Sequence, residues 1–294
     1  MVDLHTHSTF SDGTWPPRRL VEEARRLGLA AIGLTDHDSV DGNREFLEAG
    51  AEFGVAVFPG VEISTRWERV TFHLLGYGID TRLPEVRCAF ERLARSREER
   101  APRMVARLRE LGIAVTLEEV EAEANGALVG RPHVARVLVR KGVARDVQDA
   151  FARFLGRGKP AYVDKDRLPP GEACRMIRSA GGVPVLAHPG LIEAEHPGAL
   201  GTLLDHLVRD GLEGVEAYYS RHSREQQERY RSMAARRGLL VTGGSDFHEP
   251  SPDGPRLGTG LGALETPDAC AVALADRLRL RRPELAPYLE PLTR

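Results

Sequence analysis

Short apolar runs of strand length alternate with helix-length segments through most of this chain of 294 residues. Apolar runs predict strands at residues 2–7, 30–35, 55–58, 70–75, 183–187, 214–217 and 239–242. Helical periodicity predicts helices at residues 16–27, 42–53, 171–180, 199–210 and 224–237. Repeated strand–helix units with short loops are typical of a parallel sheet, so we expect an α/β barrel whose active site lies at the carboxyl ends of the strands.

Histidines and carboxylates occur in strand-spaced pairs near both ends of the chain. His5 and His7 alternate with apolar or small residues, and Asp246 and His248 repeat the spacing. In an extended strand, side chains two residues apart point the same way and lie roughly 6 to 7 Å apart. One divalent ion could therefore bind both members of a pair, since imidazole nitrogen and carboxylate oxygen are its usual donors.

Five more such residues stand at the ends of predicted strands or just after them. Six of the ten histidines fall at strand ends, a concentration that scattered core or surface histidines would not produce. The additional candidates for metal ligation are Asp12, His37, Glu62, His73 and His188. Together with the two pairs, they predict a metal centre at one rim of the barrel.

Residues 97–164 interrupt the alternation of strands and helices. Their pattern predicts consecutive helices at residues 100–111, 117–124, 132–140 and 147–155, which we interpret as a helical insertion above the rim. The predicted division is therefore residues 1–96 for the first part of the barrel, 97–164 for the insertion and 165–294 for the second part.

The insertion carries arginines at helical spacing. Such a face is commonly just solvated, but guanidinium groups also bind phosphate oxygens in pairs, and the position over the rim favours a phosphate clamp. The candidates for substrate binding are Arg97, Arg100, Arg103, Arg131 and His133.

Composition excludes several classes of protein. The net charge of -2 argues against a surface that coats nucleic acid generally, and three widely spaced cysteines suggest neither a disulfide framework nor a thiolate site. The sequence has no apolar run long enough for a membrane span and no signal peptide at its start. We expect a cytoplasmic protein with no membrane association and no obligate protein partner.

The motifs DLHTHSTFSDG, TDHD, PGVE, HLLGY, AHP and GSDFH resemble those of the polymerase and histidinol phosphatase (PHP) family of metal-dependent phosphoesterases. The resemblance covers essentially the whole chain outside the insertion. It implies a distorted (β/α)7 barrel with up to three divalent metal ions. It also implies one metal on His5, His7, Glu62 and Asp246, a second on Glu62, His73 and His188, and a third on Asp12, His37 and His248. The ligand types suit Mn, Fe or Zn, and Mn is the expected ion.

The insertion and its arginines resemble the branch of this family that acts on nucleotides. That resemblance implies removal of the 3′-phosphate from 3′,5′-nucleoside bisphosphates, and trimming of short 5′-monophosphorylated single-stranded RNA from its 5′ end. The expected nucleophile is a hydroxide held between two metals, which needs no serine, cysteine or aspartyl nucleophile. The alternatives are a phosphatase of another small ester, such as histidinol phosphate, and a non-catalytic barrel that metals merely stabilise.

For each of three further residues near the rim, the sequence leaves two possible roles open. His222 is expected either to bind phosphate or protonate the leaving oxygen, or to be a surface histidine in a loop. Asp36 and Asp38 flank His37, where they are expected either to orient its imidazole or to cap the following helix.

Overall fold

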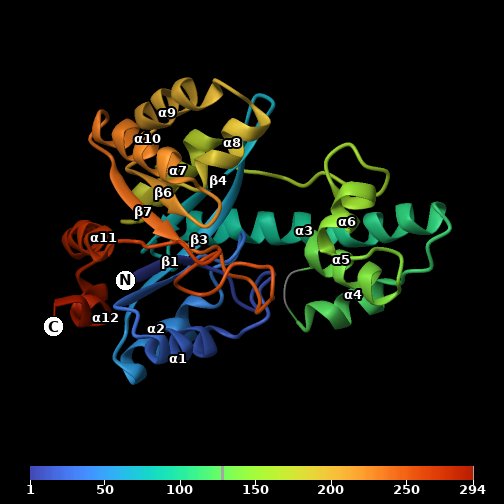
Figure 1. Ribbon diagram of the computed structural model, residues 1–294, viewed down its shortest axis with the longest axis horizontal. Helices are drawn as coiled ribbons and strands as arrows, with labels where there is room; N and C mark the ends of the chain where they lie inside the picture. Colours follow the sequence, from blue (N-terminus) through green and yellow to red (C-terminus); the bar gives the residue numbers. More distant parts are fainter. Residues whose placement is uncertain (127–128, 294) are drawn as a thin grey trace.

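The computed structural model describes residues 1–126 and 129–293 and forms a barrel with a helical arm (Figure 1). Seven strands make one sheet in chain order. They are β1 (Val2–Thr6), β2 (Ala31–Leu34), β3 (Ala56–Trp67), β4 (Val70–Tyr77), β5 (Val183–Leu186), β6 (Gly214–Tyr219) and β7 (Leu240–Gly244). All seven predicted strands are present, but β3 is much longer than the predicted residues 55–58.

The sheet is mixed rather than parallel, which corrects the expectation from sequence. Strands β1, β2 and β3 pair in parallel, as do β5, β6 and β7. Strand β4 is antiparallel to both β3 and β5. A short connection at residues 68–69 turns the chain straight back, because β3 continues past the rim and forms a hairpin with β4. As a result, Glu62 and His73 lie within paired strands and not at carboxyl ends.

Contacts between the first and last strands nearly close the barrel. The N–H of Asp246 donates to the carbonyl of His5 at 2.9 Å, and the N–H of His7 donates to the carbonyl of Phe247 at 2.9 Å. The two strands approach so closely that a Cβ atom on Gly244 would lie 2.3 Å from the backbone nitrogen of His5. The buried Asp3 carboxylate accepts hydrogen bonds from the N–H and hydroxyl of Ser245 at 2.8 and 2.6 Å. These contacts bring the ligand candidates His5 and His7 next to Asp246 and His248.

Helices cover the outside of the barrel (Figure 1). The predicted helices are present as α1 (Pro17–Leu27), α2 (Asn43–Phe53), α7 (Pro170–Ser179), α9 (Ala199–Arg209) and α10 (Arg224–Ala235). Helices that were not predicted are α8 (Pro189–Glu195), α11 (Asp268–Arg281) and the short α12 (Ala286–Leu289). Apolar residues of α11 pack with β1, β3 and β5 in one continuous core, which holds this C-terminal helix against the sheet.

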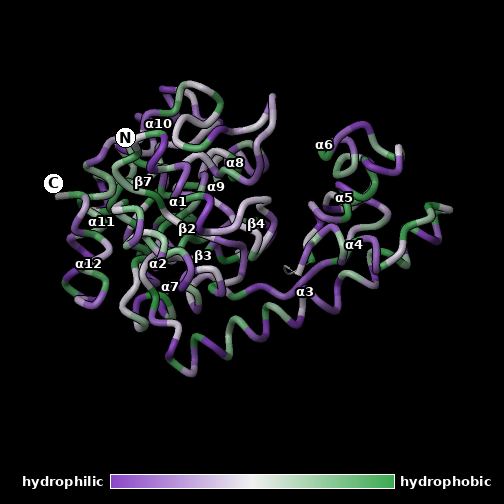
Figure 2. The backbone as a smooth tube through the Cα atoms, turned by 90° about the horizontal axis from the view of Figure 1, so that it is seen from below, coloured by the Kyte–Doolittle hydropathy of each residue, from purple (hydrophilic) through white to green (hydrophobic). Residues whose placement is uncertain are grey.

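One 27-residue helix, α3 (Pro84–Glu110), joins the barrel to the arm. Its first half buries Val86, Phe90 and Leu93 in the barrel core, and its second half buries Met104 and Leu108 in a separate core. The predicted boundary between residues 96 and 97 thus lies inside a continuous helix. Figure 2 shows α3 running out from the barrel to the arm.

The arm has its own hydrophobic core, built from residues 104–163. Its helices are α4 (Leu117–Ala124), α5 (Arg131–Arg140) and α6 (Val147–Ala150), the last continuing into a π-helical turn at Phe151–Leu155. Helix α4 begins with a capping box between Thr116 and Glu119. The division into barrel and insertion domains stays a prediction, although the two cores are distinct.

Among the described residues, no helix combines the length and the apolar character that crossing a membrane requires.

Candidate metal centre and substrate cavity

The two strand-spaced pairs meet Glu62 at the rim of the barrel. His7 Nε2 lies 3.2 Å from Glu62 Oε2 and 3.1 Å from Asp246 Oδ1. His5 Nε2 lies 3.4 Å from each of the same two oxygen atoms. Two donors that bind one ion at about 2.1 Å lie roughly 3.0 to 3.4 Å apart. This group therefore has the spacing of a metal site.

Several of these donor atoms are buried without a hydrogen-bond partner. They include Nε2 of His5, Nε2 of His7 and Oε2 of Glu62. A buried polar atom without a partner is costly, and buried polar groups in proteins are almost always satisfied. A divalent ion among these atoms would satisfy them together, so the residues fit the metal that the sequence predicts.

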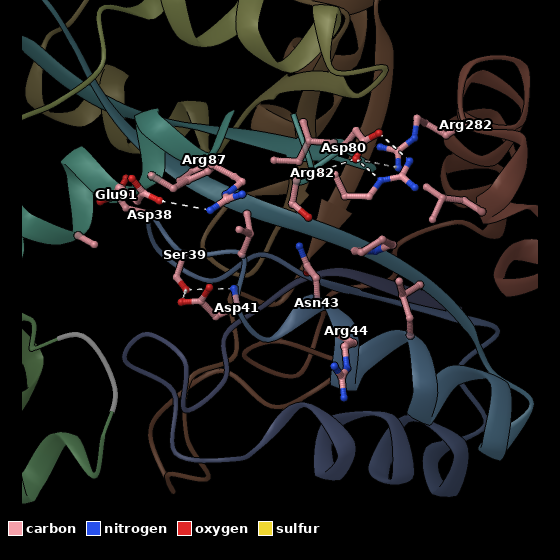
Figure 3. Close-up of a pocket in the computed structure, with 18 residues that line it drawn as sticks. Asp38, Ser39, Asp41, Asn43, Arg44, Asp80, Arg82, Arg87, Glu91 and Arg282 are labelled. Atoms are coloured by element: carbon pink, nitrogen blue, oxygen red, sulfur yellow. Dashed lines mark hydrogen bonds and ion pairs between the residues drawn. The ribbon is translucent and has the colours of Figure 1, made fainter. Parts of the chain in front are cut away.

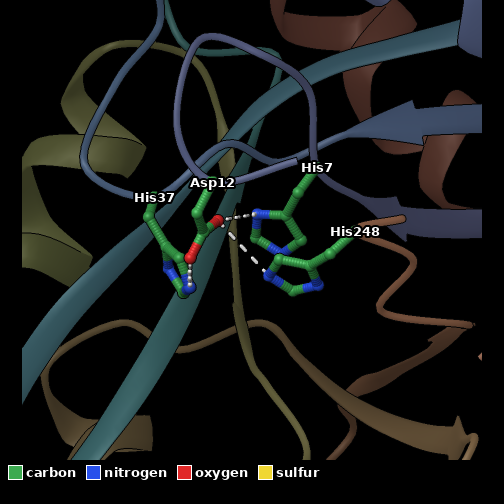
Figure 4. Close-up of side chains that lie close together, drawn as sticks. All are labelled: His7, Asp12, His37 and His248. Atoms are coloured by element: carbon green, nitrogen blue, oxygen red, sulfur yellow. Dashed lines mark ion pairs between the residues drawn. The ribbon is translucent and has the colours of Figure 1, made fainter. Parts of the chain in front are cut away.

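A second group surrounds Asp12, as Figure 4 shows. His248 Nε2 lies 3.3 Å from Asp12 Oδ1, and His7 Nδ1 lies 3.8 Å from the same oxygen. His37 Nε2 lies 3.8 Å from Asp12 Oδ2. The imidazoles of His7 and His248 stack with their ring centres 4.0 Å apart. The four side chains could hold one ion.

Glu62 is the centre of a third group. Its Oε1 lies 2.7 Å from His73 Nδ1 and 2.9 Å from His188 Nε2, and its Oε2 lies 3.0 Å from His37 Nδ1. The nine predicted ligands thus form one contiguous cluster. Its grouping differs from the expected one, because His7 also faces Asp12 and His37 also faces Glu62. The ligand role of each residue stays a prediction.

The electrostatics of the cluster favour bound cations. Burial opposes ionisation of Glu62, but His37 and His73 outweigh it and hold the pKa of the carboxyl well below its usual range. Burial lowers the pKa of His37 to about 4, so its imidazole is charged in the acid range where Glu62 would take up a proton, but is neutral at pH 7 and keeps a lone pair for a metal.

Glu216, which the sequence analysis did not single out, orients two of the histidines. Its Oε1 accepts from His5 Nδ1 at 2.8 Å, and its Oε2 accepts from the backbone N–H of His188 at 2.7 Å. A proton on Nδ1 leaves the Nε2 lone pair of His5 free to face a metal. The signal in the sequence was a carboxylate inside the otherwise apolar strand β6.

Backbone strain also concentrates here. Asp38, His188 and Asp246 have positive φ values of 52°, 27° and 58°. L-residues rarely adopt such values, and they persist where surrounding structure enforces them, often at functional sites.

In residues 1–126 and 129–293, Asp36 and Asp38 contact groups other than the His37 imidazole and the start of α2. Asp36 accepts from the N–H of Ser8 at 2.7 Å and from the hydroxyl of Ser11 at 2.6 Å, which fixes the loop that carries Asp12. Asp38 accepts from the N–H of Ser64 at 2.8 Å and pairs with Arg97 at 2.7 Å. Among the described residues, no side chain caps the start of α2.

The cluster opens into a cavity of about 790 Å³ between the barrel and the arm. Six of its lining residues are basic, in addition to the metal-ligand candidates. They are Arg97, Arg100, Arg131, Lys165, Arg167 and Arg221.

Three of the predicted substrate-binding arginines therefore lie at the cavity. Arg97 is held by Asp38, and Arg100 Nε donates to the carbonyl of Val163 at 2.7 Å. The guanidinium of Arg131 lies 5.2 Å from the ring centre of Phe151. Burial is the main cause that lowers the pKa of Arg100 to about 9, and the positive charges of Arg131 and Arg97 add to it.

Sequence reasoning missed Lys165 and Arg167, which follow the insertion. Lys165 Nζ donates to Ser64 Oγ at 2.7 Å and pairs with Asp38. Arg167 pairs with Asp164 beside it. Lysine is rare in this chain, and a lysine at the point where the chain re-enters the barrel was the available signal.

The other three predicted substrate contacts do not line the cavity. Arg103 is exposed on the outer face of α3. His133 is buried, and its Nδ1 accepts from the N–H of Gly130 at 2.9 Å at the start of α5. Both ring nitrogens of His222 are occupied, since Nδ1 donates to the carbonyl of Ala217 at 2.9 Å and Nε2 accepts from the N–H of Gly190 at 3.1 Å. His222 therefore supports the loop in this structure, which argues against the predicted role as an acid or a phosphate ligand.

A second cavity of about 550 Å³ lies near the loop after β2 (Figure 3). Its arginines are matched by carboxylates, as in Arg82 with Asp80 at 2.8 Å and Arg87 with Glu91 at 3.9 Å. The described residues that line it include no histidine. The cavity that meets the histidine and carboxylate cluster is therefore the candidate active site.

Comparison with known proteins decides the family. The sequence model of the PHP domain matches residues 3–155, just over half of the chain. The chain belongs to the PHP domain family. It is similar to a 3′,5′-nucleoside bisphosphate phosphatase of Chromobacterium violaceum, with 35% identity over 262 residues that cover 87% of this chain and 90% of that protein. It is also 34% identical to the 5′-3′ exoribonuclease Rnm of Escherichia coli, with 86% of each chain covered.

Solved structures agree with this assignment. A protein of Bifidobacterium adolescentis described as a proposed metal-dependent phosphoesterase superposes with a TM-score of 0.84 and 35% identity, over 94% of this chain and 96% of that one. The predicted family, barrel fold and enzyme class, a metal-dependent phosphoester hydrolase, are confirmed.

Proposed function

We propose that this hydrolase removes the 3′-phosphate from 3′,5′-nucleoside bisphosphates and releases nucleoside 5′-monophosphates. The observation that carries the proposal is that a strongly basic wall and the nine-donor cluster face the same cavity. A substrate with two phosphates matches these two anion-binding places. The names of the similar phosphatase and exoribonuclease support the same class of substrate.

The basic wall would bind the phosphate that does not react. Arg100, Arg131 and Arg167 supply planar guanidinium groups, which bind phosphate oxygens in pairs. Their partners hold them in place, so little side-chain freedom is lost on binding. Binding energy from this remote phosphate would orient the scissile phosphate at the cluster.

The histidine and carboxylate cluster would hold the ions, Mn being our proposal, beside the scissile phosphate. Bound divalent ions neutralise phosphate charge and lower the pKa of water toward neutrality. Glu216 would fix His5, and the Tyr219 hydroxyl would fix Asp246 by donating to its Oδ2 at 3.1 Å. Burial, with Asp246 nearby, raises the pKa of Tyr219, so this hydroxyl keeps its proton for that bond.

The apolar side chains that line the cavity suit a nucleoside better than a small amino alcohol. Phe72, Phe151, Leu191 and Ile192 line it, and aromatic and aliphatic side chains pack against bases without reading their edges. The volume of about 790 Å³ lies in the range of sites for whole cofactor-sized ligands. We therefore rank histidinol phosphate below a nucleotide, and we propose 5′-monophosphorylated RNA as a second substrate that presents the same two phosphates.

A panel of phosphate esters tests the proposal. With Mn added, adenosine 3′,5′-bisphosphate (pAp) should give a far higher kcat/KM than adenosine 3′-monophosphate, histidinol phosphate or an aryl phosphate, and AMP should be its product. Equal kcat/KM for pAp and adenosine 3′-monophosphate would show that the 5′-phosphate does not contribute to substrate recognition. A higher value for histidinol phosphate would overturn the nucleotide assignment.

A further inference from the structure

Arg221 differs from the other basic residues of the cavity in its origin. Arg97, Arg100, Arg131, Lys165 and Arg167 come from α3, the arm or the segment that follows it. Arg221 comes from the barrel, in the loop between β6 and α10. It shares its part of the cavity wall with Tyr219, whose hydroxyl contacts Asp246.

The backbone on both sides of Arg221 is fixed. The Ser220 hydroxyl donates to the carbonyl of Ser245 at 2.5 Å, which ties the loop to the segment after β7. His222 accepts from the N–H of Gly190 at 3.1 Å, which ties the loop to α8. The Arg221 side chain therefore projects from an anchored position at the cavity.

The guanidinium itself is exposed and unengaged. In residues 1–126 and 129–293, no carboxylate or carbonyl oxygen makes an ion pair or hydrogen bond with Arg221. The basic residues from α3, the arm and the segment after it are, by contrast, held by neighbours such as Asp38, Asp164 or the carbonyl of Val163. An anchored arginine with a free guanidinium beside a phosphate-hydrolysing centre is a natural second contact for an anionic substrate.

The geometry of the reaction determines which part of a substrate lies near Arg221. In the proposed reaction the bond between phosphorus and O3′ breaks, a water molecule gives its hydroxyl to phosphorus, and its proton goes to O3′. In RNA, the rest of the chain is attached to another oxygen of the same phosphorus. In an in-line displacement, that oxygen lies to the side of the line between the attacking and leaving oxygens. The rest of the chain then leaves the cluster to the side of that line, and Arg221 is the basic lining residue that the barrel itself supplies.

We propose that Arg221 binds the phosphate that follows the scissile one in an oligonucleotide. The inference rests on the proposed function and adds a binding place for the part of the RNA that is retained. After each cleavage, the shortened chain carries a 5′-phosphate and is again a substrate for the basic wall. Arg221 would thus act as a specificity-determining residue that favours oligonucleotides over bisphosphate mononucleotides.

Three substrates isolate this contact when the Mn-loaded protein is used. The bisphosphate pAp has nothing after the scissile phosphate, pApA adds a nucleoside, and pApApA adds the following phosphate. The measured quantity is the ratio of kcat/KM for the first cleavage of pApApA to that of pApA. Arg221→Ala should lower this ratio roughly threefold to tenfold, the effect of one exposed charged contact. Arg221→Lys should recover part of it.

Arg224 provides a matched control. It is an exposed arginine at the first position of α10 and does not line the cavity, so Arg224→Ala should leave the ratio at its wild-type value. An unchanged ratio in Arg221→Ala, with pAp still hydrolysed, would overturn the inference and spare the proposed function. An equal loss on all three substrates would assign Arg221 to the scissile group and also overturn the inference. Failure of the wild-type protein to hydrolyse pAp would instead reject the proposed function.

Discussion

Arg97 on α3 reaches the barrel and donates to Asp38 through Nε at 3.1 Å and Nη2 at 2.7 Å. Asp38 directly follows the metal-ligand candidate His37, and both partners of the ion pair are buried. Burial opposes the charge on Asp38, but Lys165 and Arg97 outweigh it and keep the pKa of the carboxyl low. The contact couples the arm that would bind one phosphate to the cluster that would act on the other.

Removal of metal should abolish hydrolysis, because the proposed reaction depends on the ions that the cluster holds. We expect a chelator to stop phosphate release from pAp and Mn to restore it. Glu62→Ala and Asp246→Ala should each reduce kcat by orders of magnitude and lower the bound metal measured by elemental analysis. The exposed Glu265→Ala serves as the control. Full activity of metal-free protein would contradict the assignment.

Glu216→Gln should weaken metal binding although Glu216 is not itself a ligand candidate. Both of its oxygens accept hydrogen bonds, one from His5 and one from the N–H of His188. A glutamine can accept only one of them, since its NH2 group donates. Loss of such a supporting contact typically costs about 10–100-fold in metal affinity or activity. Titration of the apo protein with Mn measures the affinity, and unchanged affinity would show that His5 needs no such support.

Two arginines of α3 form a matched pair for testing the basic wall. Arg100 lines the cavity, whereas Arg103 is exposed one turn further on and does not line it. Arg100→Ala should raise KM for pAp by roughly ten- to a hundredfold, as expected for lost charge-assisted bonds. Arg103→Ala should leave KM unchanged, in contrast to the role that the sequence suggested for it. If both variants behave alike in steady-state kinetics, the wall is only a solvated face.

The binding of pAp should weaken as the pH rises through neutrality. Burial, with Arg97 nearby, lowers the pKa of Lys165 from its usual 10.5 to about 7, against the opposing effect of Asp38. Lys165 is therefore charged below about pH 7 and loses its proton above it, so KM for pAp should rise as pH increases past 7. Lys165→Arg keeps its charge, and its KM should lack that rise between pH 6 and 9. A parallel rise in both proteins would assign the titration to another group.

Much of the barrel could be predicted because apolar runs of strand length report burial directly. All seven strands were found in this way, and most ligand candidates met because the strand ends and the loops after them gather at one rim, whereas Glu62 and His73 reach it from inside β3 and β4. The direction of β4 could not be read, since the period of a strand is the same in parallel and antiparallel pairing. The continuity of α3 was hidden by Pro102, which lies inside the helix although proline usually marks a first turn.

The metal-centre candidates were easier to predict than the substrate contacts. A ligand set is recognisable from residue types and spacing, whereas a phosphate contact depends on which way one side chain points. His222 lies at the rim as expected, but its ring turns to Ala217 and Gly190. The rarity of lysine marked Lys165 only weakly, since its place beside Ser64 exists only in the folded chain.

The continuous helix α3 fixes the distance and the rotation between the barrel core and the arm core. Residues of its first half are buried in the barrel core, and residues of its second half are buried in the arm core. An added residue in its middle would turn the arm by about 100° and move it by about 1.5 Å. The arm would then present another set of side chains to the rim while the nine-donor cluster stayed intact. Homologous enzymes with the same cluster could therefore acquire a new substrate range through the length of one helix, without changing any residue that meets the reacting phosphate.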